Sequence, residues 1–429
     1  QQAGRLLRTA DDLFEAFLHT HNAPVPSNEL PQQFETALGR LEAQGVIRRL
    51  GFGNLILLQP ERLDAYASAL LIEAKDDPDG LGSIPEVRVQ QGQFSVPAED
   101  RLSNPTQEKL LLIAMIDELL RHQLVLREGG SLLFPSQLTR EHPDYATLVD
   151  KQVVIFTFAG SVLSLYTTLV VRLAQSGILR KQEIWQHVVT YTTRLGGTYG
   201  LLLSSRSEER AELGLFFDEA TREEMRFHFE SFVHTHLEQH TGGAVQRRRR
   251  FVCPTCGEAF TETQVSNRQV RGFTSIRCST CETEVSLLDG AERLTTPLAS
   301  LVKVMEQAAD AHRDRESAAS ILQGKIATQD FDVFLCHHGQ DKPKVKQVGE
   351  QLKHYGVLPW LDEWELRPGL PWQRLLEEQI SRIKAAAVFV GKDGLGPWQH
   401  QELDAFLREF AHRGCPVIPV LLADCLLYT

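Results

Sequence analysis

The sequence has few of the features that mark secreted or disulfide-rich proteins. Its 429 residues include 7 cysteines, 3 methionines and 8% aromatic residues. Four cysteines form two close pairs, while Cys336, Cys415 and Cys425 are scattered among apolar residues. This distribution does not suit a disulfide framework, so we expect a reducing, cytoplasmic compartment and one metal site.

Long apolar runs are also scarce. The uncharged run 153–171 is interrupted by Gly160 and diluted by several hydroxyl side chains, so a buried strand followed by a packed helix is favoured over a membrane span. The chain opens with Gln-Gln-Ala-Gly and shows no charged leader before an apolar core. We therefore expect no membrane segment and a true start that lies upstream.

The composition is that of an ordinary folded protein, with 42% hydrophobic and 24% charged residues. This length predicts two to four domains. A net charge of −11 argues against a protein that coats nucleic acid through its whole surface. The one conspicuous basic cluster, Arg247–Arg250, is more typical of a solvated face or linker, so nucleic acid is a less favoured partner.

The N-terminal region shows one theme twice. Residues 1–65 predict a helix, a turn, a second helix and then a hairpin around Gly51–Asn54, which is the layout of a winged helix. Residues 66–149 predict a similar helix and hairpin around Gly129–Gly130. Some winged helices bind DNA, but here the arginines near the second helix alternate with glutamates. A structural module inside a regulated protein is favoured.

Residues 150–240 predict an α+β module that begins with a strand, Gly160 and a helix, and ends with a helix from about Thr221 to Glu238. Together with the segment before it, this module loosely resembles the COR region that follows the GTPase domain in Roc–COR proteins. The resemblance implies an NTPase domain upstream of residue 1. No G-x-x-x-x-G-K-[ST] motif occurs in this chain, so nucleotide hydrolysis is not predicted for it.

Residues 250–288 predict a zinc ribbon. Two C-x-x-C knuckles are separated by a stretch long enough for a hairpin, and they supply the ligands Cys253, Cys256, Cys278 and Cys281. Four thiolates complete a closed tetrahedral shell, so the Zn²⁺ is expected to be structural. The alternative, a redox-active C-x-x-C, would need a thioredoxin-like βαβ setting that this pattern lacks.

Residues 291–326 predict a helical linker. Its apolar stripe runs along an amphipathic helix from Leu298 to about Leu322. A charged tail at 312–316 suggests a spacer that presents the next domain. Self-association through the stripe and packing against a neighbouring domain are both consistent with the pattern.

Residues 329–429 alternate strands and helices, with fully apolar runs such as Ala385–Val390 and Pro416–Leu422. This alternation predicts an α/β doubly wound parallel sheet. The segments DVFLCH-x-x-x-DK, PWLDEWELRPG and AAAVFVGKDGLGPWQHQEL closely resemble bacterial TIR domains, in order and spacing. The resemblance implies a flavodoxin-like fold, here lacking its last strand and helix, and covers about a quarter of the chain.

Many bacterial TIR domains cleave NAD⁺ between nicotinamide and ribose, and the resemblance implies that activity here. The catalytic glutamate of the family corresponds to Glu402, four residues after Trp398 and on the same helix face. The alternative for Glu402 is an ordinary exposed helix glutamate. The first loop reads His338-Gly339 where the family usually has Asn-Ser, which puts its ligand contacts in doubt. Expected substrate-site residues are Trp398, His337, Asp341, Asp362, Trp364 and Gly369.

The sequence thus predicts a multidomain signalling or defence protein of bacterial-immunity type. Its TIR domain would hydrolyse NAD⁺ when regulatory modules bring it together with other TIR domains. A second hypothesis is a non-catalytic scaffold that only binds other TIR domains. A third is a DNA-linked regulator that uses the winged helices and the zinc ribbon; the acidic balance counts against it.

Overall fold

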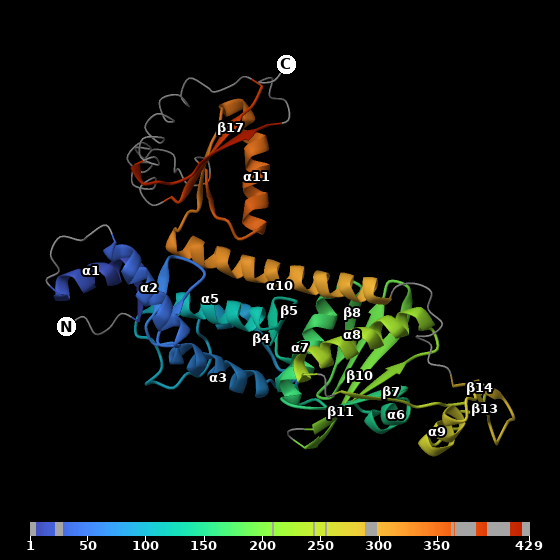
Figure 1. Ribbon diagram of the computed structural model, residues 1–429. Coiled ribbons are helices and arrows are strands. Elements are labelled where there is room, and N and C mark those ends of the chain that lie inside the picture. The colour runs from blue at the N-terminus through green and yellow to red at the C-terminus, as the bar shows by residue number, and fades with distance from the viewer. Residues whose placement is uncertain are drawn as a thin grey trace. The chain divides into compact units, whose positions relative to one another are not determined.

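Figure 1 shows a computed structural model of the chain. It describes residues 6–21, 29–207, 210–242, 245–253, 255–287, 298–361, 364, 383–392 and 412–422. The chain divides into two compact units. The first comprises residues 1–69, 90–118 and 314–429, and the second comprises residues 70–89 and 119–313.

The chain begins with a small helix–hairpin segment. Its elements are β1 (Leu7–Thr9), α1 (Ala10–His21), α2 (Leu30–Ala43), β2 (Arg48–Arg49) and β3 (Leu55–Leu57). The strands form an antiparallel sheet in the order β1-β3-β2. Leu38 of α2 packs on Ile47 and Ile56, and Gly45 follows α2 with a positive φ of 72°. The predicted helices and hairpin are present, β1 is additional, and the winged-helix assignment stays a prediction.

A second helix–hairpin segment follows. It comprises α3 (Glu61–Lys75), β4 (Ser83–Pro85), α4 (Glu86–Gln90), α5 (Pro105–Arg121), β5 (Leu126–Glu128), β6 (Ser131–Leu133) and the 3₁₀ turn η1 (Pro135–Gln137). Its sheet has the order β4-β6-β5. The predicted helix and hairpin are observed, with Gly129 and Gly130 between β5 and β6, both at positive φ.

The largest sheet has six antiparallel strands in the order β12-β7-β11-β10-β9-β8. Its elements are α6 (Tyr145–Asp150), β7 (Val154–Ala159), α7 (Val162–Gln175), β8 (Leu179–Ile184), β9 (Val188–Thr193), β10 (Gly196–Ser207), β11 (Arg210–Phe217), α8 (Glu223–Thr241) and β12 (Gln246–Arg249). Leu201 and Leu203 share a core with α7 and α8, whereas Leu202 packs with Leu148 of α6. This alternation is the period-2 pattern of a strand between two layers.

The basic run Arg247–Arg250, interpreted from sequence as a solvated face or linker, contributes most of edge strand β12, which pairs with β7. Each arginine side chain has an acidic neighbour. Arg247 and Arg249 contact Glu230, Arg248 lies 2.6 Å from Glu212, and Arg250 lies 3.9 Å from Asp150. The charge of the run is therefore largely compensated inside the protein.

The paired cysteines lie in a separate small segment with helix α9 (Glu262–Val270) and strands β13 (Ser275–Arg277) and β14 (Glu284–Ser286). By its length, the stretch between the knuckles could form a hairpin. It instead forms α9 and β13, and the second knuckle lies between the paired strands β13 and β14. A capping box of Thr261 and Gln264 starts α9.

The last part of the chain begins with helix α10 (Leu298–Thr328), which extends beyond the predicted end at Leu322. Val302, Met305 and Ala309 of the predicted stripe are buried. Then follow β15 (Val333–Cys336), the 3₁₀ turn η3 (Gly339–Asp341), α11 (Lys342–His354), β16 (Pro359–Trp360), β17 (Ala385–Val390) and β18 (Val417–Leu421).

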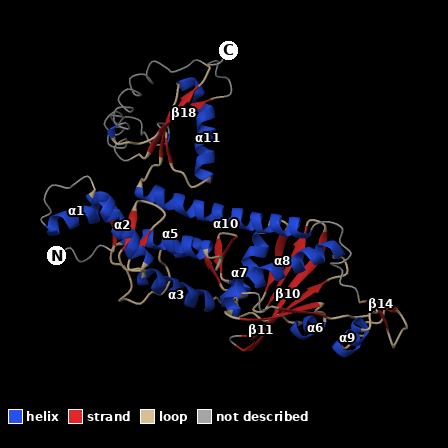
Figure 2. Ribbon diagram, in the orientation of Figure 1, coloured by secondary structure: helices blue, strands red, loops and turns tan. Residues whose placement is uncertain are grey.

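These four strands form a parallel sheet, as the alternating pattern predicted, in the order β16-β15-β17-β18. Figure 2 shows strands of this sheet in red beside helix α11. The two faces of the sheet carry separate apolar cores: Phe334, Trp360 and Val388 on one, and Leu335, Val345 and Phe389 on the other. The helices that the alternating pattern predicts between β16 and β17 and between β17 and β18 fall almost entirely outside the described residues.

Among the helices that the structure describes, none has the length and apolar character needed to cross a bilayer. The uncharged run 153–171 divides at Gly160 into β7 and α7, as predicted.

The six-stranded sheet and its helices are expected to lose stability in acid through His236. Its ring is 3% exposed and burial lowers its pKa to about 3, well below that of a solvated histidine. Between pH 6.5 and about 3 the unfolded chain therefore binds a proton that the folded one does not, and the free energy of unfolding falls by at most about 5 kcal/mol. The free energy of unfolding, measured with urea, should change less steeply with pH in His236→Gln than in the parent. Equal slopes over that range would contradict the assignment.

Candidate functional site

The candidate site lies at the carboxyl edge of the parallel sheet. Cys336 ends β15 and is followed by His337, Asp341 lies just before α11, and Gly391 follows β17. Neighbouring parallel strands end at the same edge, so the first loop and the residue after β17 come together there. Clefts for ligands in doubly wound sheets form at this edge.

Asp341 is the most informative residue of this edge. Its side chain is 9% exposed, and its Oδ2 is buried with no hydrogen-bond partner among the residues that the structure describes. The carboxylate lies directly over Gly391: a Cβ built there would be 2.2 Å from Oδ1 and 2.3 Å from Oδ2. Only glycine fits at that position without displacing the carboxylate. Burying a carboxylate oxygen without a hydrogen bond lowers the stability of the fold. Such groups in native proteins call for an explanation, such as a ligand.

His337 lies in the same loop as Asp341, directly after β15, and is half-buried. Its Nδ1 is 3.1 Å from the backbone carbonyl of Leu335. A donated Nδ1–H bond of this kind leaves Nε2 as the acceptor nitrogen of the neutral ring. His338 instead has a local role, because its Nδ1 accepts a hydrogen bond from the backbone N–H of Gln340 at the start of η3.

Trp364, one of the expected substrate-site residues, packs against α11. A Cβ built at Gly349 would lie 2.7 Å from the Trp364 ring, and Lys353 Nζ is 3.6 Å from the ring centroid. The contact is a cation–π pair on the helix surface. It anchors Trp364 to α11. The remaining predicted residues, Asp362, Gly369, Trp398 and Glu402, lie outside the described part of the chain.

The sequence did not single out Gly391, whose contact with Asp341 shapes the edge. The only signal was its place directly after a fully apolar strand. Cys336, expected to be a core residue, is 3% exposed and packs with Phe331 and Trp360.

The second candidate site is the cysteine cluster. The Sγ atoms of Cys253, Cys256, Cys278 and Cys281 all lie within 4.8 Å of one another. Cys253 and Cys281 sulfurs are 3.3 Å apart, and Cys256 and Cys278 sulfurs are 3.5 Å apart. Sulfurs gathered this closely, from two knuckles far apart in sequence, fit a single tetrahedral metal ion.

The two knuckles have the same backbone geometry. In the first, the N–H of Cys253 donates to Glu258 and the N–H of Gly257 donates back to Cys253. In the second, the N–H of Cys278 donates to the backbone carbonyl of Thr283, and the N–H of Glu282 donates to the carbonyl of Cys278. The fourth residue after each leading cysteine, Gly257 or Glu282, has a positive φ. Hydrogen bonding between Cys281 and Thr283 lowers the pKa of the Cys281 thiol to about 6, which favours the thiolate that a metal binds.

Residues 333–428 match a family model described as "TIR domain". Over 96 residues the chain is 28% identical to a protein named "NAD(+) hydrolase TcpA" from Theionarchaea archaeon (strain DG-70-1). The aligned part covers 22% of this chain and 29% of that relative. The matches therefore identify a C-terminal TIR domain and a distant relative of it, and they do not extend to the segments upstream.

Removing one cysteine of the cluster should release the metal. Loss of a thiolate ligand should lower the affinity for zinc by at least about tenfold. Purified Cys278→Ser is therefore expected to contain less than about one-tenth of the zinc found in the parent. Residues 251–287 should then become sensitive to proteolysis, because the metal contributes their folding free energy. Zinc content by mass spectrometry is the measurement, with Cys415→Ser as the control. Equal zinc in the parent and Cys278→Ser would reject the cluster as the site.

Proposed function

We propose that the TIR domain hydrolyses NAD⁺ at the bond between nicotinamide and ribose. The TIR match and the named NAD⁺ hydrolase among its relatives support this reaction class. The observation that carries the proposal is the buried Oδ2 of Asp341, which has no hydrogen-bond partner among the described residues and lies over Gly391, at the edge of the sheet where a ligand would lie.

The chemistry needs only carboxylates and an enclosed site. Nicotinamide in NAD⁺ is already a cationic leaving group, so no general acid has to protonate it. Glu402 would stabilise the positive charge that develops on the ribose as the bond breaks. Asp341 would accept hydrogen bonds from hydroxyl groups of the bound nucleotide, which satisfies its unpaired Oδ2. His337, with Nε2 as an acceptor, lies on the same loop.

The rest of the chain would regulate this domain. Activation would require assembly with other TIR domains, in a cytoplasmic signalling or defence protein. The cysteine cluster would hold a structural Zn²⁺, since four thiolates leave no open coordination position. The helix–hairpin segments would be winged helices, the six-stranded sheet a COR-like module, and an NTPase domain would precede residue 1.

A non-catalytic TIR scaffold is the second candidate, and the same domain match is consistent with it. The DNA-linked regulator is less well supported. Arg49 is paired with Glu35 and Glu42, Arg48 contacts Glu118, and the Arg247–Arg250 run is compensated by acidic side chains. These six arginines therefore offer little uncompensated positive charge to phosphates.

The enzymatic proposal is tested by comparing Glu402→Gln with the parent at high protein concentration. The parent should release nicotinamide from NAD⁺, and the variant should lose at least about 100-fold in rate, because a charge formed in the transition state is no longer stabilised. Asp404→Asn, two residues along the same predicted helix, is the matched control and should remain active. Release by both variants at the parent rate would remove Glu402 from the mechanism.

Asp341→Asn should separate function from folding. The substitution keeps the size of the side chain and removes an unpaired buried charge, and Asp341 makes no side-chain cap to α11. Thermal stability should therefore stay equal or rise, while kcat/KM for NAD⁺ falls by about 10- to 100-fold. Paired melting curves and initial rates measure both. Loss of stability with unchanged kcat/KM would show a purely structural carboxylate.

A further inference from the structure

The turn between β2 and β3 is buried in an unusual way. It consists of Gly51, Phe52, Gly53 and Asn54, and the last two have positive φ values of 67° and 47°. Phe52 at its centre is 3% exposed, although it lies at the tip of a hairpin. Hairpin tips are normally solvated, so this one has a binding partner within the protein.

That partner is the C-terminal half of α10. The Phe52 ring lies flat on Gly324, where an added Cβ would be 2.3 Å from Cγ and Cδ1 of the ring. Gly324 lies near the C-terminal end of α10 but still within the helix, where glycine is less favourable than alanine. Next to it, a Cβ built at Gly51 would meet Ile321 at 3.2 Å, so the backbone of the turn also approaches α10 closely. The aromatic ring and the two glycines are complementary in shape.

A polar contact continues the interface into the start of the TIR domain. The backbone N–H of Gly53 donates to Asp330 Oδ2 at 2.9 Å, just after α10 ends. Lys384 Nζ donates to the same oxygen at 2.9 Å and to Asp332 Oδ1 at 3.1 Å. Asp330 is thus shared by the turn and by the residue that precedes β17.

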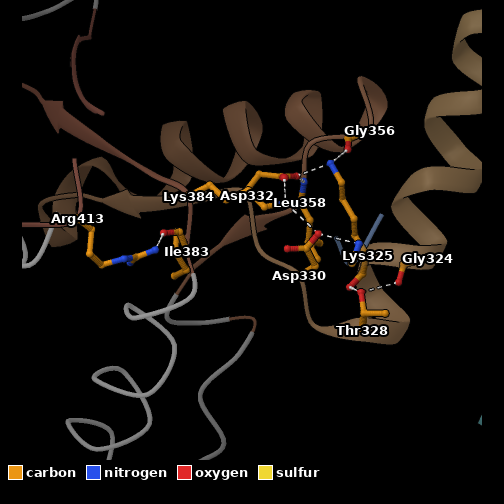
Figure 3. Close-up of polar contacts among 11 residues, drawn as sticks. Gly324, Lys325, Thr328, Asp330, Asp332, Gly356, Leu358, Ile383, Lys384 and Arg413 are labelled. Atoms are coloured by element: carbon orange, nitrogen blue, oxygen red, sulfur yellow. Dashed lines mark hydrogen bonds and ion pairs between the residues drawn. The ribbon is translucent and has the colours of Figure 1, made fainter. Parts of the chain in front are cut away.

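Figure 3 shows the polar contacts that connect the end of α10 and Asp332 to the starts of the parallel strands. We call this set of contacts the joint. Asp332 Oδ2 accepts from Lys325 Nζ and from the backbone N–H of Leu358, both at 2.7 Å. Lys325 also donates to the carbonyl of Gly356 at 2.8 Å. The contacts lie at the amino-terminal edge of the sheet, opposite the edge with Asp341 and Gly391. They can therefore hold the domain without occupying its candidate site.

We propose that the β2–β3 turn is an intramolecular latch for the TIR domain. Seated on Gly324 and Asp330, it fixes the end of α10 and thereby the orientation in which α10 presents the parallel sheet. When the turn leaves α10, Asp330 loses one of its partners and the joint loosens. The freed TIR domain then associates with TIR domains of other copies; this last step rests on the proposed function, whereas the latch contact does not.

Two substitutions open the latch from opposite sides. Phe52→Ala removes the ring, and Gly324→Ala inserts a methyl group where the ring lies. Both should raise amide hydrogen exchange at residues 51–55 and 321–332 by at least about tenfold in the full chain. Gly324→Ala is the sharper test, because alanine in a helix interior would otherwise stabilise α10 and slow its exchange. Phe273→Ala, an exposed phenylalanine of the cysteine-rich segment, should leave these residues unchanged.

The double variant Phe52→Ala/Gly324→Ala tests direct contact, because the methyl group then occupies space that the ring has vacated. Its exchange rates should rise by less than the product of the two single effects. Unchanged exchange in either single variant would overturn the latch, and so would a fully multiplicative double variant.

Self-association of both single variants, measured by sedimentation velocity, should exceed that of the parent. Faster exchange without any gain in self-association would overturn the regulatory role. Neither measurement uses NAD⁺, so a chain that fails to hydrolyse NAD⁺ contradicts the proposed reaction and leaves the latch to be judged by exchange and sedimentation alone.

Discussion

The carboxylate of Asp332 is the interaction on which the C-terminal part of the structure depends. It joins a lysine of α10, the lysine before β17 and the first backbone N–H of the β16 segment. Lys325 and Asp332 side chains are 12% and 18% exposed, so the pair is poorly screened by solvent. Burial alone would lower the pKa of Lys384, yet Asp330 and Asp332 raise it and keep the ammonium charged. One carboxylate thus ties three strand starts to the end of one long helix.

This arrangement leaves the two edges of the parallel sheet with different tasks. The amino-terminal edge is filled with paired charges and is fixed to α10. The carboxyl edge has a buried carboxylate with an unsatisfied oxygen, placed over a glycine that no other residue could replace without moving it. Such a division is expected of a domain that is held at one end and meets its ligand at the other. Of the upstream segments, the β2–β3 turn contacts the held end, through the hydrogen bond from Gly53 to Asp330.

The sequence was informative where chemistry and periodicity are local. The two C-x-x-C knuckles predicted a cluster that the structure brings together, and the apolar runs predicted the parallel strands β15, β17 and β18. Strands β8 and β12 were missed because they are polar, with Lys-Gln-Glu and Arg-Arg-Arg in their cores. Both are edge strands, where one side faces away from the sheet and polar side chains are favoured. Glycines were harder still: nothing in the sequence tells that Gly324 receives Phe52 or that Gly391 lies under Asp341, since both contacts join residues that are distant in the chain. The proposed catalytic residue Glu402 and the expected substrate-site residue Trp398 rest on the sequence resemblance alone.

We propose that assembled TIR domains of this chain cleave NAD⁺, and the first measurement to make is the concentration dependence of nicotinamide release. Purified protein should release nicotinamide at a specific rate that rises with protein concentration, because the proposed active form is an assembly. A specific rate that does not change with concentration would contradict the requirement for assembly. No nicotinamide at any concentration, under conditions in which an active TIR hydrolase turns over NAD⁺, would contradict the enzymatic account and leave the TIR domain as a scaffold.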